Sequence, residues 1–509
     1  MVTHTPVPDH DVIVVGAGFS GIGAAIKLGQ EGFDYLVVEA SDGVGGTWHL
    51  NTYPGVAVDI PSFSYAFSFE QGQRWSRTYA PGAELKEYAE RCVTKYGLRP
   101  NIRLSTKIAR AEFDEPADLW RLFTDAGEEM TSRFVIYAVG PFSEPQTPDI
   151  PGIDSYAGTV MHTARWDHRQ DLSGRRVGII GTGASAVQVI PAIAPQVERL
   201  TVFQRTPIWV LPRVDLPLSR AAHIALDKLP LVRRAARLAS QAVVEATFVV
   251  AAQYNRTLPM LAGSGSHAGR RFLRREVKDP VLRKKLTPNY PLGCKRPSFS
   301  NTYLAAFNRP NVVLETDPIA QVTPRGIVTA DGTEHEFDTL ILATGFKLFG
   351  TGGMPSFRIA GKGGADLAAW WAENRYQAYQ GASVPGFPNV FTILGPYAYN
   401  GSSYFELIEN QLRHIIRCLT TAEERGATRV EISEEANTEY FESMIDRRDR
   451  QIFFNQDCSN ANSYYFDPNG DVPFRSATTL HSRWASEHFS IDDYEFTHRA
   501  LASVTCWST

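Results

Sequence analysis

The sequence predicts an α/β protein, because an apolar strand, a glycine-rich turn, a helix and a second apolar strand follow one another twice along the chain. The first occurrence begins with the apolar run 11–15 and continues through the turn 16–21 (GAGFSG) and a helical stretch to about Glu31. It closes with the apolar run 35–38 and Glu39. Short apolar runs joined by a helix are typical of buried parallel strands, so this segment is predicted to form a βαβ unit.

The second occurrence begins about 165 residues later. The apolar run 177–180 leads into the turn 181–186 (GTGASA), a helical stretch reaches about Ala194, and the run 200–203 precedes Arg205. Two βαβ units of this kind predict two Rossmann-like domains, each with a ligand site where the first strand meets its helix.

The glycines of these turns have the spacing needed to bind the pyrophosphate of a dinucleotide. Gly16 permits a tight turn, Gly18 lets the backbone approach the phosphates, and Gly21 lets the helix pack closely on the strand. Backbone N–H groups at the start of the helix then face the negative charge. Glu39 follows the second strand, where a carboxylate accepts hydrogen bonds from ribose hydroxyls.

The second turn differs from the first in two places. Gly181 and Gly183 keep the first two glycines, and Ala186 takes the third position, where the packing tolerates it. Arg205 closes the unit where the first has Glu39. A cation suits the 2′-phosphate of NADPH and an acid repels it, so the first site is predicted to bind FAD and the second NADPH. The other candidate contacts in the second site are Thr182, Ser185, Gln188 and Thr206.

Two such sites in one chain imply that hydride passes from a nicotinamide to a flavin. We expect an FAD domain at 1–145 and 346–509, with the NADPH domain, 146–215 and 288–345, inserted in it. The alanine- and arginine-rich segment 216–287 is predicted to be a further, helical insertion. Its cluster of Arg270, Arg271, Arg274, Arg275 and Lys278 is interpreted as a solvated face, with a phosphate or lipid surface as the alternative.

Composition excludes several other classes of protein. The 509 residues carry a net charge of −4, so no overall electrostatic attraction to nucleic acid is expected. The cysteines at 92, 294, 418, 458 and 506 form no CxxC pair. That spacing argues against a zinc site, any other metal site, a redox-active dithiol and a disulfide scaffold, and favours a reducing compartment.

No segment has the features of a membrane anchor or a signal peptide. Residues 1–10 have neither a basic region nor an apolar stretch, and the apolar run 242–252 is shorter than the ~20 residues that span a bilayer. We therefore expect a cytoplasmic protein without an integral membrane segment, as a monomer or weak homodimer.

Two further motifs carry a resemblance to a known family. Residues 156–167, YAGTVMHTARWD, resemble the fingerprint F-x-G-x-x-x-H-x-x-x-W-P/D of type I Baeyer–Villiger monooxygenases, with Tyr156 in place of Phe. Residues 45–59 are similar to a second family motif, G-G-x-W-x-x-x-x-Y-P-G-x-x-x-D, without departure. The segments 293–297 (GCKRP) and 343–346 (ATGF) resemble the family's K-R-P and A-T-G segments.

The resemblance implies an FAD- and NADPH-dependent oxidoreductase that incorporates one oxygen atom (EC 1.14.13.-). In this family NADPH reduces FAD, O2 adds to the reduced flavin, and the resulting peroxyflavin converts a ketone to an ester or lactone. Arg296 matches the family's catalytic arginine, and Asp59 matches the carboxylate that orients it. A fixed cation in a dry site stabilises the anionic states of such a reaction.

The remaining family positions imply binding or conformational roles. Lys295 corresponds to a lysine that reaches the NADPH 2′-phosphate together with Arg205. Gly158, His162 and Trp166 correspond to a linker that transmits domain movement. The other positions expected at the cofactors are Gly46, Thr47, Trp48, Ala343, Thr344 and Gly345.

Near the C-terminus the match is looser. Ser463-Tyr464-Tyr465 stands where many members have Ser-Trp-Tyr in a loop that closes on NADP. Tyr397, Tyr399 and Tyr404 resemble the substrate-facing bulge in position only, and core packing is the alternative.

Three activities remain open from the sequence. The first is ketone oxygenation, with thioethers as further substrates. The second is oxygenation at sulfur or nitrogen as the main task. The third is an NADPH oxidase or redox-sensing flavoprotein without oxygenation, against which Asp59 and Arg296 argue, since nucleotide binding needs neither.

Overall fold

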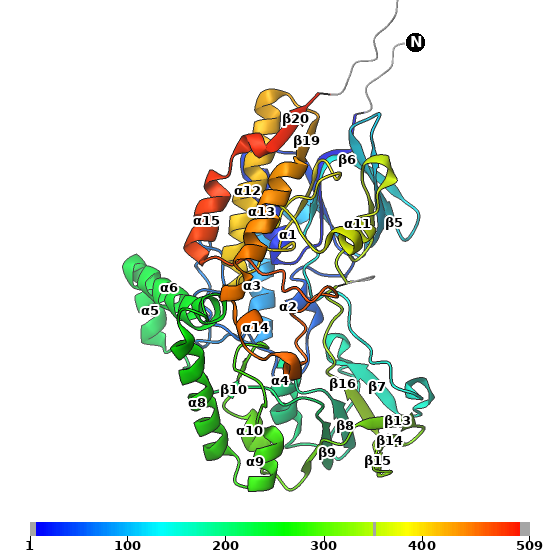
Figure 1. Ribbon diagram of the computed structural model, residues 1–509, viewed down its shortest axis with the longest axis vertical. Coiled ribbons are helices and arrows are strands. Elements are labelled where there is room, and N and C mark those ends of the chain that lie inside the picture. The colour runs from blue at the N-terminus through cyan, green and yellow to red at the C-terminus, as the bar shows by residue number, and fades with distance from the viewer. Residues whose placement is uncertain (1–6, 350–352, 499–509) are drawn as a thin grey trace, which may run out of the picture.

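The computed structural model describes residues 7–349 and 353–498, except for the side chains of residues 261 and 262. Two sheets, each with its own hydrophobic core, lie at opposite ends of the molecule (Figure 1). Helices of the segment 216–287 project to one side of them. The predicted α/β class with two Rossmann-like units and a helical insertion is confirmed.

The first sheet combines a parallel half with an antiparallel meander. Its strand order is β17-β4-β5-β6-β1-β2-β3, and β18 pairs with β6. The strands are β1 (His10–Val15), β2 (Tyr35–Val38), β3 (Ile102–Arg103), β4 (Ile108–Asp114), β5 (Leu119–Thr124), β6 (Glu129–Tyr137), β17 (Arg358–Ala360) and β18 (Val390–Thr392). Both β2 and β6 run parallel to β1, so the glycine turn leaves the centre of the sheet.

Backbone geometry explains how the first unit closes. The helix α1 (Phe19–Glu31) begins directly after Gly18 and ends at Gly32, whose φ of 82° places it in the left-handed region. A Cβ on Gly21 would lie 1.8 Å from the carbonyl oxygen of Gly16. Only glycine therefore allows the helix to approach the strand this closely.

The chain returns to this domain near its C-terminus. The helix α12 (Tyr404–Arg425) packs against α1, and residues of both helices share one core cluster. The other helices of this half are α2 (Thr47–Leu50), α3 (Gly82–Lys95), α11 (Leu367–Asn374), α13 (Glu434–Asp446), α14 (Ile452–Asn455) and α15 (Thr479–His488). A two-stranded ribbon of β19 (Arg429–Ile432) and β20 (Tyr494–Thr497) closes the far end.

The second sheet is entirely parallel, in the order β12-β9-β8-β16-β7. Its elements are β7 (Thr159–His162), β8 (Arg176–Ile180), α4 (Ala184–Ile193), β9 (Arg199–Phe203), α10 (Tyr303–Ala306), β12 (Val312–Glu315) and β16 (Thr339–Leu342). A small antiparallel sheet of β13 (Ile319–Thr323), β14 (Gly326–Thr329) and β15 (Glu334–Glu336) follows β12. All strands of the parallel sheet fall within 146–215 and 288–345, but the domain boundaries themselves stay a prediction.

The insertion consists of α5 (Arg220–Lys228), α6 (Pro230–Val244), a π-helical turn at Glu245–Val250, α7 (Ala251–Gln253), α8 (Pro259–Glu276) and α9 (Pro280–Leu286). It lies between β10 (Val210–Leu211) and β11 (Ser298–Phe299), which pair with each other. Segments α6, the π turn and α7 form one helix, Pro230–Gln253, long and apolar enough by length and composition to cross a membrane. In the sequence, only its 11 residues 242–252 form a recognisable apolar run.

Replacing Gly21 with alanine is expected to destabilise the first domain by about 3 kcal/mol, because the added methyl group meets a backbone carbonyl that cannot move aside. The measurement is the thermal and urea unfolding midpoint. Gly263→Ala is the matched control, since it adds the same group to the exposed helix α8 with no atom within 4 Å. Equal midpoints for the two variants would contradict the packing argument.

Candidate functional site

One cavity of about 1490 Å³ is lined by both glycine turns. Pockets for single small molecules are usually about 300–1,000 Å³, so this cavity has room for more than one ligand. The predicted cofactor positions along it are Gly16, Gly18, Glu39, Gly46, Thr47, Trp48, Asp59, Gly181, Thr182, Gly183, Ser185, Arg205, Thr206, Lys295, Ala343, Thr344 and Gly345. Gly21, Gln188, Gly158, His162 and Trp166 are not part of the lining.

The first turn forms a cradle without side chains. A Cβ on Gly46 would lie 3.0 Å from the Cα of Gly18, so the two backbones approach each other at the start of α1. Gly45 donates its N–H to the carbonyl oxygen of Ala17 at 2.8 Å, which fixes this approach. Bare backbone at a helix N-terminus fits the pyrophosphate of a dinucleotide.

Glu39 lies at the end of β2, almost fully buried, and lines the cavity. Its Oε2 accepts the N–H of Ala17 at 2.7 Å, and its Oε1 accepts the N–H of Ser41 at 2.8 Å. A carboxylate has about four acceptor positions, so capacity remains for ribose hydroxyls. The same carboxylate therefore holds the glycine turn in place.

The second glycine turn, residues 181–186, lies beside two cationic side chains. A Cβ on Gly183 would meet no atom within 4 Å, and Thr182 donates its hydroxyl to the carbonyl oxygen of Thr206 at 3.0 Å. Arg205 and Lys295 both line the cavity beside this turn. Burial and the nearby charge of Arg205 lower the pKa of the Lys295 ammonium. A phosphate dianion between the two cations would relieve this repulsion.

Gln188 is engaged in holding the two domains together. Its Oε1 accepts the hydroxyl of Tyr53 at 3.0 Å, and its Nε2 donates to the carbonyl oxygen of Ala57 at 3.0 Å. Both partners belong to the loop that leads to Asp59. Gln188 therefore makes a contact across the domain junction, and its expected cofactor contact stays a prediction.

Arg296 and Asp59 meet on the cavity wall. The Arg296 Nε donates to Asp59 Oδ2 at 2.6 Å, and its Nη1 donates to the hydroxyl of Tyr399 at 3.0 Å. The guanidinium also lies 4.6 Å from the ring centroid of Phe248. Burial alone would lower the pKa of Arg296, but Asp59 and nearby tyrosines outweigh it and hold the pKa well above its usual value. This arrangement keeps a permanent positive charge in a fixed direction.

Aromatic side chains surround this cation. Tyr399 packs edge-on against Phe474 with centroids 4.7 Å apart, and Tyr464 packs against Tyr465 at 4.6 Å. These four residues and Tyr404 line the cavity. Although Tyr464 is 40% exposed as a whole residue, loss of solvation at its hydroxyl raises its pKa to about 12, so the hydroxyl stays protonated at neutral pH.

The three tyrosines of the predicted substrate-facing bulge do not all lie at the cavity. Tyr399 and Tyr404 face the cavity, as the resemblance suggested. Tyr397 does not line it: this side chain is buried and packs edge-on against Phe441.

The fingerprint segment lies at the hinge between the domains. His162 ends β7, which pairs with β16 in the register Leu342 opposite His162, and β16 runs directly into the segment 343–346. The His162 ring packs edge-on against Phe346 with centroids 6.1 Å apart. Burial lowers the pKa of His162, so the ring is neutral at physiological pH. These contacts fit a conformational role.

Tyr156 explains the departure from the fingerprint. Its hydroxyl donates to the carbonyl oxygen of Phe337 at 2.9 Å, a bond that phenylalanine could not make. The ring covers Gly158 so closely that a Cβ there would lie 2.6 Å from the Tyr156 hydroxyl oxygen. The substitution therefore preserves the turn and adds a hydrogen bond.

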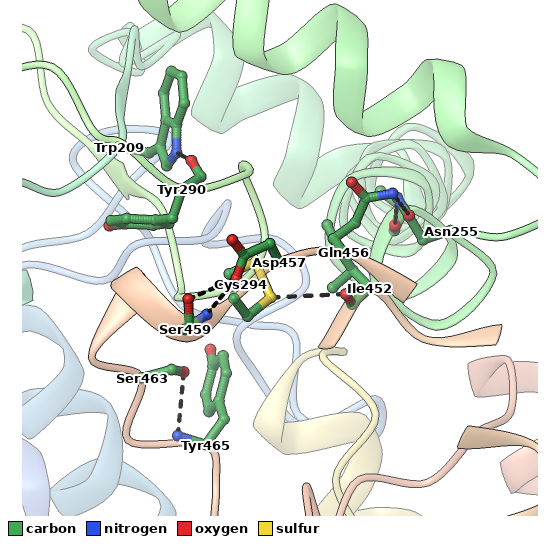
Figure 2. The surroundings of a disulfide bond; sticks show 12 residues. Trp209, Asn255, Tyr290, Cys294, Ile452, Gln456, Asp457, Ser459, Ser463 and Tyr465 are labelled. Carbon is green, nitrogen blue, oxygen red and sulfur yellow. Dashed lines mark hydrogen bonds between the residues drawn. A yellow bond between two sulfur atoms is a disulfide. The ribbon is translucent and has the colours of Figure 1, made fainter. Parts of the chain in front are cut away.

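The cysteine prediction was wrong in one respect. Cys294 and Cys458 form a disulfide, which closes a sequence separation of 164 residues (Figure 2). Cys92 and Cys418 are free and buried, and Cys506 lies outside the described residues. Spacing along the chain could not reveal this pair, because folding alone brings the two cysteines together.

The disulfide joins two segments that serve the cavity. Cys294 directly precedes Lys295 and Arg296, and Cys458 belongs to the segment that continues to Tyr464 and Tyr465. Around the bond, Trp209 donates its indole N–H to the carbonyl oxygen of Tyr290 at 2.9 Å (Figure 2). The C-terminal aromatics are thereby tied to the segment of the catalytic candidate.

Sequence reasoning missed Phe248, which contacts Arg296 from the helical insertion and is marked by no local pattern. It named Tyr399 as a residue of the bulge but not its hydrogen bond to Arg296, which joins residues 103 positions apart.

Comparisons with known proteins agree with this geometry. The family described as pyridine nucleotide-disulphide oxidoreductase matches residues 13–219, which hold both glycine turns. A Baeyer–Villiger monooxygenase of Streptomyces coelicolor is 37% identical over 99% of this chain and 96% of its own length. A Baeyer–Villiger monooxygenase of Pseudomonas aeruginosa is 35% identical over 97% of this chain and 93% of its own length.

Solved structures are similar over nearly the whole chain. OTEMO in complex with FAD and NADP superposes with a TM-score of 0.87 at 29% identity, covering 97% of this chain and 100% of the other. Cyclohexanone monooxygenase from Rhodococcus sp. Phi1, bound to NADP+, gives 0.85 at 29% identity, covering 96% and 99%.

Breaking the disulfide is expected to lower the free energy of unfolding by about 2–4 kcal/mol, because the cross-link restricts the unfolded chain. Cys458→Ser and treatment of the natural chain with a dithiol reductant should lower the thermal midpoint alike. Treating Cys458→Ser with the same reductant is the control and should change nothing further. If the reductant left the thermal midpoint of the natural chain unchanged, the stabilising role of the disulfide would be contradicted.

Proposed function

This chain belongs to the Baeyer–Villiger monooxygenases, and we propose that Arg296, oriented by Asp59, supports insertion of one oxygen atom of O2 beside a ketone carbonyl to give an ester or lactone. The enzyme uses FAD and NADPH. The observation that carries the residue assignment is the 2.6 Å bond between Arg296 Nε and Asp59 Oδ2 on the wall of the cavity that both glycine turns share.

The residues of the cavity suit these two cofactors. The glycine cradle and Glu39 would hold the pyrophosphate and ribose of FAD. The turn at Gly181–Gly183 would hold the pyrophosphate of NADPH, and Arg205 and Lys295 would hold its 2′-phosphate. When bound, the pair supplies reducing electrons from the nicotinamide and an oxygen-activating flavin ring.

The role proposed for Arg296 follows from its surroundings. Attack on a ketone carbonyl creates negative charge on the substrate oxygen, and a cation already in place stabilises it without reorganisation. Asp59 and Tyr399 fix the plane of the guanidinium from two sides. The aromatic side chains around it leave the Arg296 side chain only 19% exposed, and this partial desolvation strengthens the electrostatic effect.

The side chains that line the cavity near Arg296 indicate the class of substrate. Apolar faces of Phe474, Tyr404 and Tyr465 suit a small ketone or thioether without charge, taken with O2. We assign the activity to the oxidoreductases that incorporate one oxygen atom, EC 1.14.13.-.

We also propose a cytoplasmic enzyme that works as a monomer or weak homodimer, although the Cys294–Cys458 disulfide removes the cysteine argument for a reducing compartment. The long helix Pro230–Gln253 is fastened to the protein through Arg237, which donates to the carbonyl oxygen of Ala66 at 2.9 Å. This contact supports an enzyme without a membrane-spanning segment.

Arg296→Ala is expected to slow ester formation by about 10²-fold or more, the usual effect of removing one oxyanion-stabilising donor. Asp59→Asn keeps the shape of the side chain but loses its charge, and should slow the reaction by about tenfold. The measurement is the rate of ester formation from a panel of ketones at matched flavin content. Arg325→Ala removes an exposed arginine of the small sheet and serves as the control. Near-natural rates for Arg296→Ala would remove Arg296 from the mechanism.

NADPH affinity is expected to fall as pH rises through the lowered pKa of Lys295. The protonated ammonium binds the 2′-phosphate, and the neutral amine does not, so the KM for NADPH should rise with pH while that for NADH stays level. Lys295→Arg should abolish this dependence, because arginine keeps its charge. Lys295→Ala should raise the KM for NADPH about 10–100-fold, as expected for one hydrogen bond between charged groups. If the KM for NADPH and the KM for NADH changed with pH in the same way, the assignment of Lys295 to the 2′-phosphate would be contradicted.

A further inference from the structure

We propose that the outer face of helix α6 docks the enzyme on the surface of an anionic lipid bilayer. This face consists of Leu231, Val232, Ala235, Leu238, Ala239, Ala242 and Val243 of α6 with Ala246 of the π turn that continues it, and is called the α6 face below. The proposal concerns binding to a membrane surface and stands independently of the reaction.

The α6 face is continuous, apolar and exposed. At 100° per residue its eight members cover one side of the helix, and every one of them is exposed. Leu231 is 80% exposed, Leu238 56% and Val243 52%. Helices α5 and α6 project from the body of the molecule, with α6 at its edge (Figure 1). An apolar helix face left open to solvent marks a site of interaction.

The opposite side of the same helix is fixed to the protein. Arg237, Ser240 and Val244 are buried there, and Arg237 forms an ion pair with Glu406. Just beyond α6, Glu245 accepts the N–H of Thr479 at 3.0 Å. Because these contacts hold the helix against the first domain, it can lie in the plane of a bilayer surface but cannot thread through the bilayer.

The positive charge of the helical insertion favours an anionic partner. Residues 216–287 contain 14 Lys and Arg against 4 Asp and Glu, a local net charge of +10 in a chain whose total is −4. Arg234 borders the α6 face and Lys228 lies just before α6, and no ion pair within residues 7–349 and 353–498 involves either of them. Apolar residues rimmed by unpaired cations are the pattern of a helix that binds anionic headgroups.

The same charge disfavours a second copy of the chain as the partner. A twofold dimer through the α6 face would bring Lys228 and Arg234 of one copy close to the same cations of the other. Negatively charged headgroups remove this repulsion, and the apolar side chains enter the headgroup boundary. A bilayer surface therefore satisfies both features of the segment.

The docking helix continues to a residue that contacts Arg296. The π turn after α6 carries Phe248, whose ring lies 4.6 Å from the Arg296 guanidinium and packs edge-on against Phe299. A docked enzyme would thus connect the bilayer surface, which concentrates apolar ketones, to the surroundings of Arg296. This last consequence rests on the proposed function, whereas docking itself does not.

The test is flotation of the FAD-loaded enzyme with two kinds of vesicle, phosphatidylcholine alone and phosphatidylcholine with phosphatidylglycerol. Binding to the anionic vesicles should be at least about tenfold stronger and should weaken as salt is added. The triple variant Leu231→Ser/Leu238→Ser/Val243→Ser should lose binding, and Lys228→Glu/Arg234→Glu should weaken it by about tenfold or more. Val281→Ser, which alters an exposed apolar residue on α9, should bind as the natural chain does.

Three results would overturn the proposal. These are a natural chain that stays with neither vesicle, a triple variant that floats as well as the natural chain, and a natural dimer that the triple variant dissociates. Flavin content and thermal midpoint show that each variant is folded. Loss of oxygenation with intact flotation would count against the proposed function alone.

Discussion

A carboxylate and a guanidinium from distant parts of the chain meet in the shared cavity, and the surrounding structure depends on their meeting. Asp59 follows the glycine cradle of the first domain, and Arg296 follows the helical insertion, 237 residues later. The Arg296 side chain is mostly buried, and a buried charge is stable only when it is paired and hydrogen-bonded. The second domain and the insertion must therefore return the chain to within hydrogen-bond distance of Asp59.

Several independent contacts enforce that return. Tyr399 holds the other edge of the guanidinium, Phe248 covers its face, and the disulfide at Cys294 restrains the segment that carries it. Gln188 ties the helix of the second turn to the loop that leads to Asp59. The cation that we propose as catalytic is thus positioned before substrate arrives, which is the condition for efficient electrostatic catalysis.

The sequence allowed the local parts of this arrangement to be predicted, because they depend on short-range chemistry. The periodicity of apolar residues indicates the approximate bounds of the strands and helices in both βαβ units. The small size and free backbone of glycine indicate the two turns, and the end of the second strand marks Glu39. The pairing of Asp59 with Arg296 came from the resemblance. The disulfide, the bond of Gln188 to Tyr53 and the stacking of Phe248 on Arg296 join residues that are distant in sequence. No periodicity encodes such contacts, so only the folded chain reveals them.

The most direct test of the account measures where the oxygen goes. Purified FAD-loaded enzyme would be given NADPH, 18O2 and a panel of cyclic, linear and aryl ketones with one thioether, while NADPH consumption, ester, sulfoxide and hydrogen peroxide are followed together. The account predicts about one ester per NADPH for a suitable ketone, carrying one 18O atom, with little peroxide. Peroxide equal to NADPH for every ketone, whether or not the thioether yields sulfoxide, would contradict it.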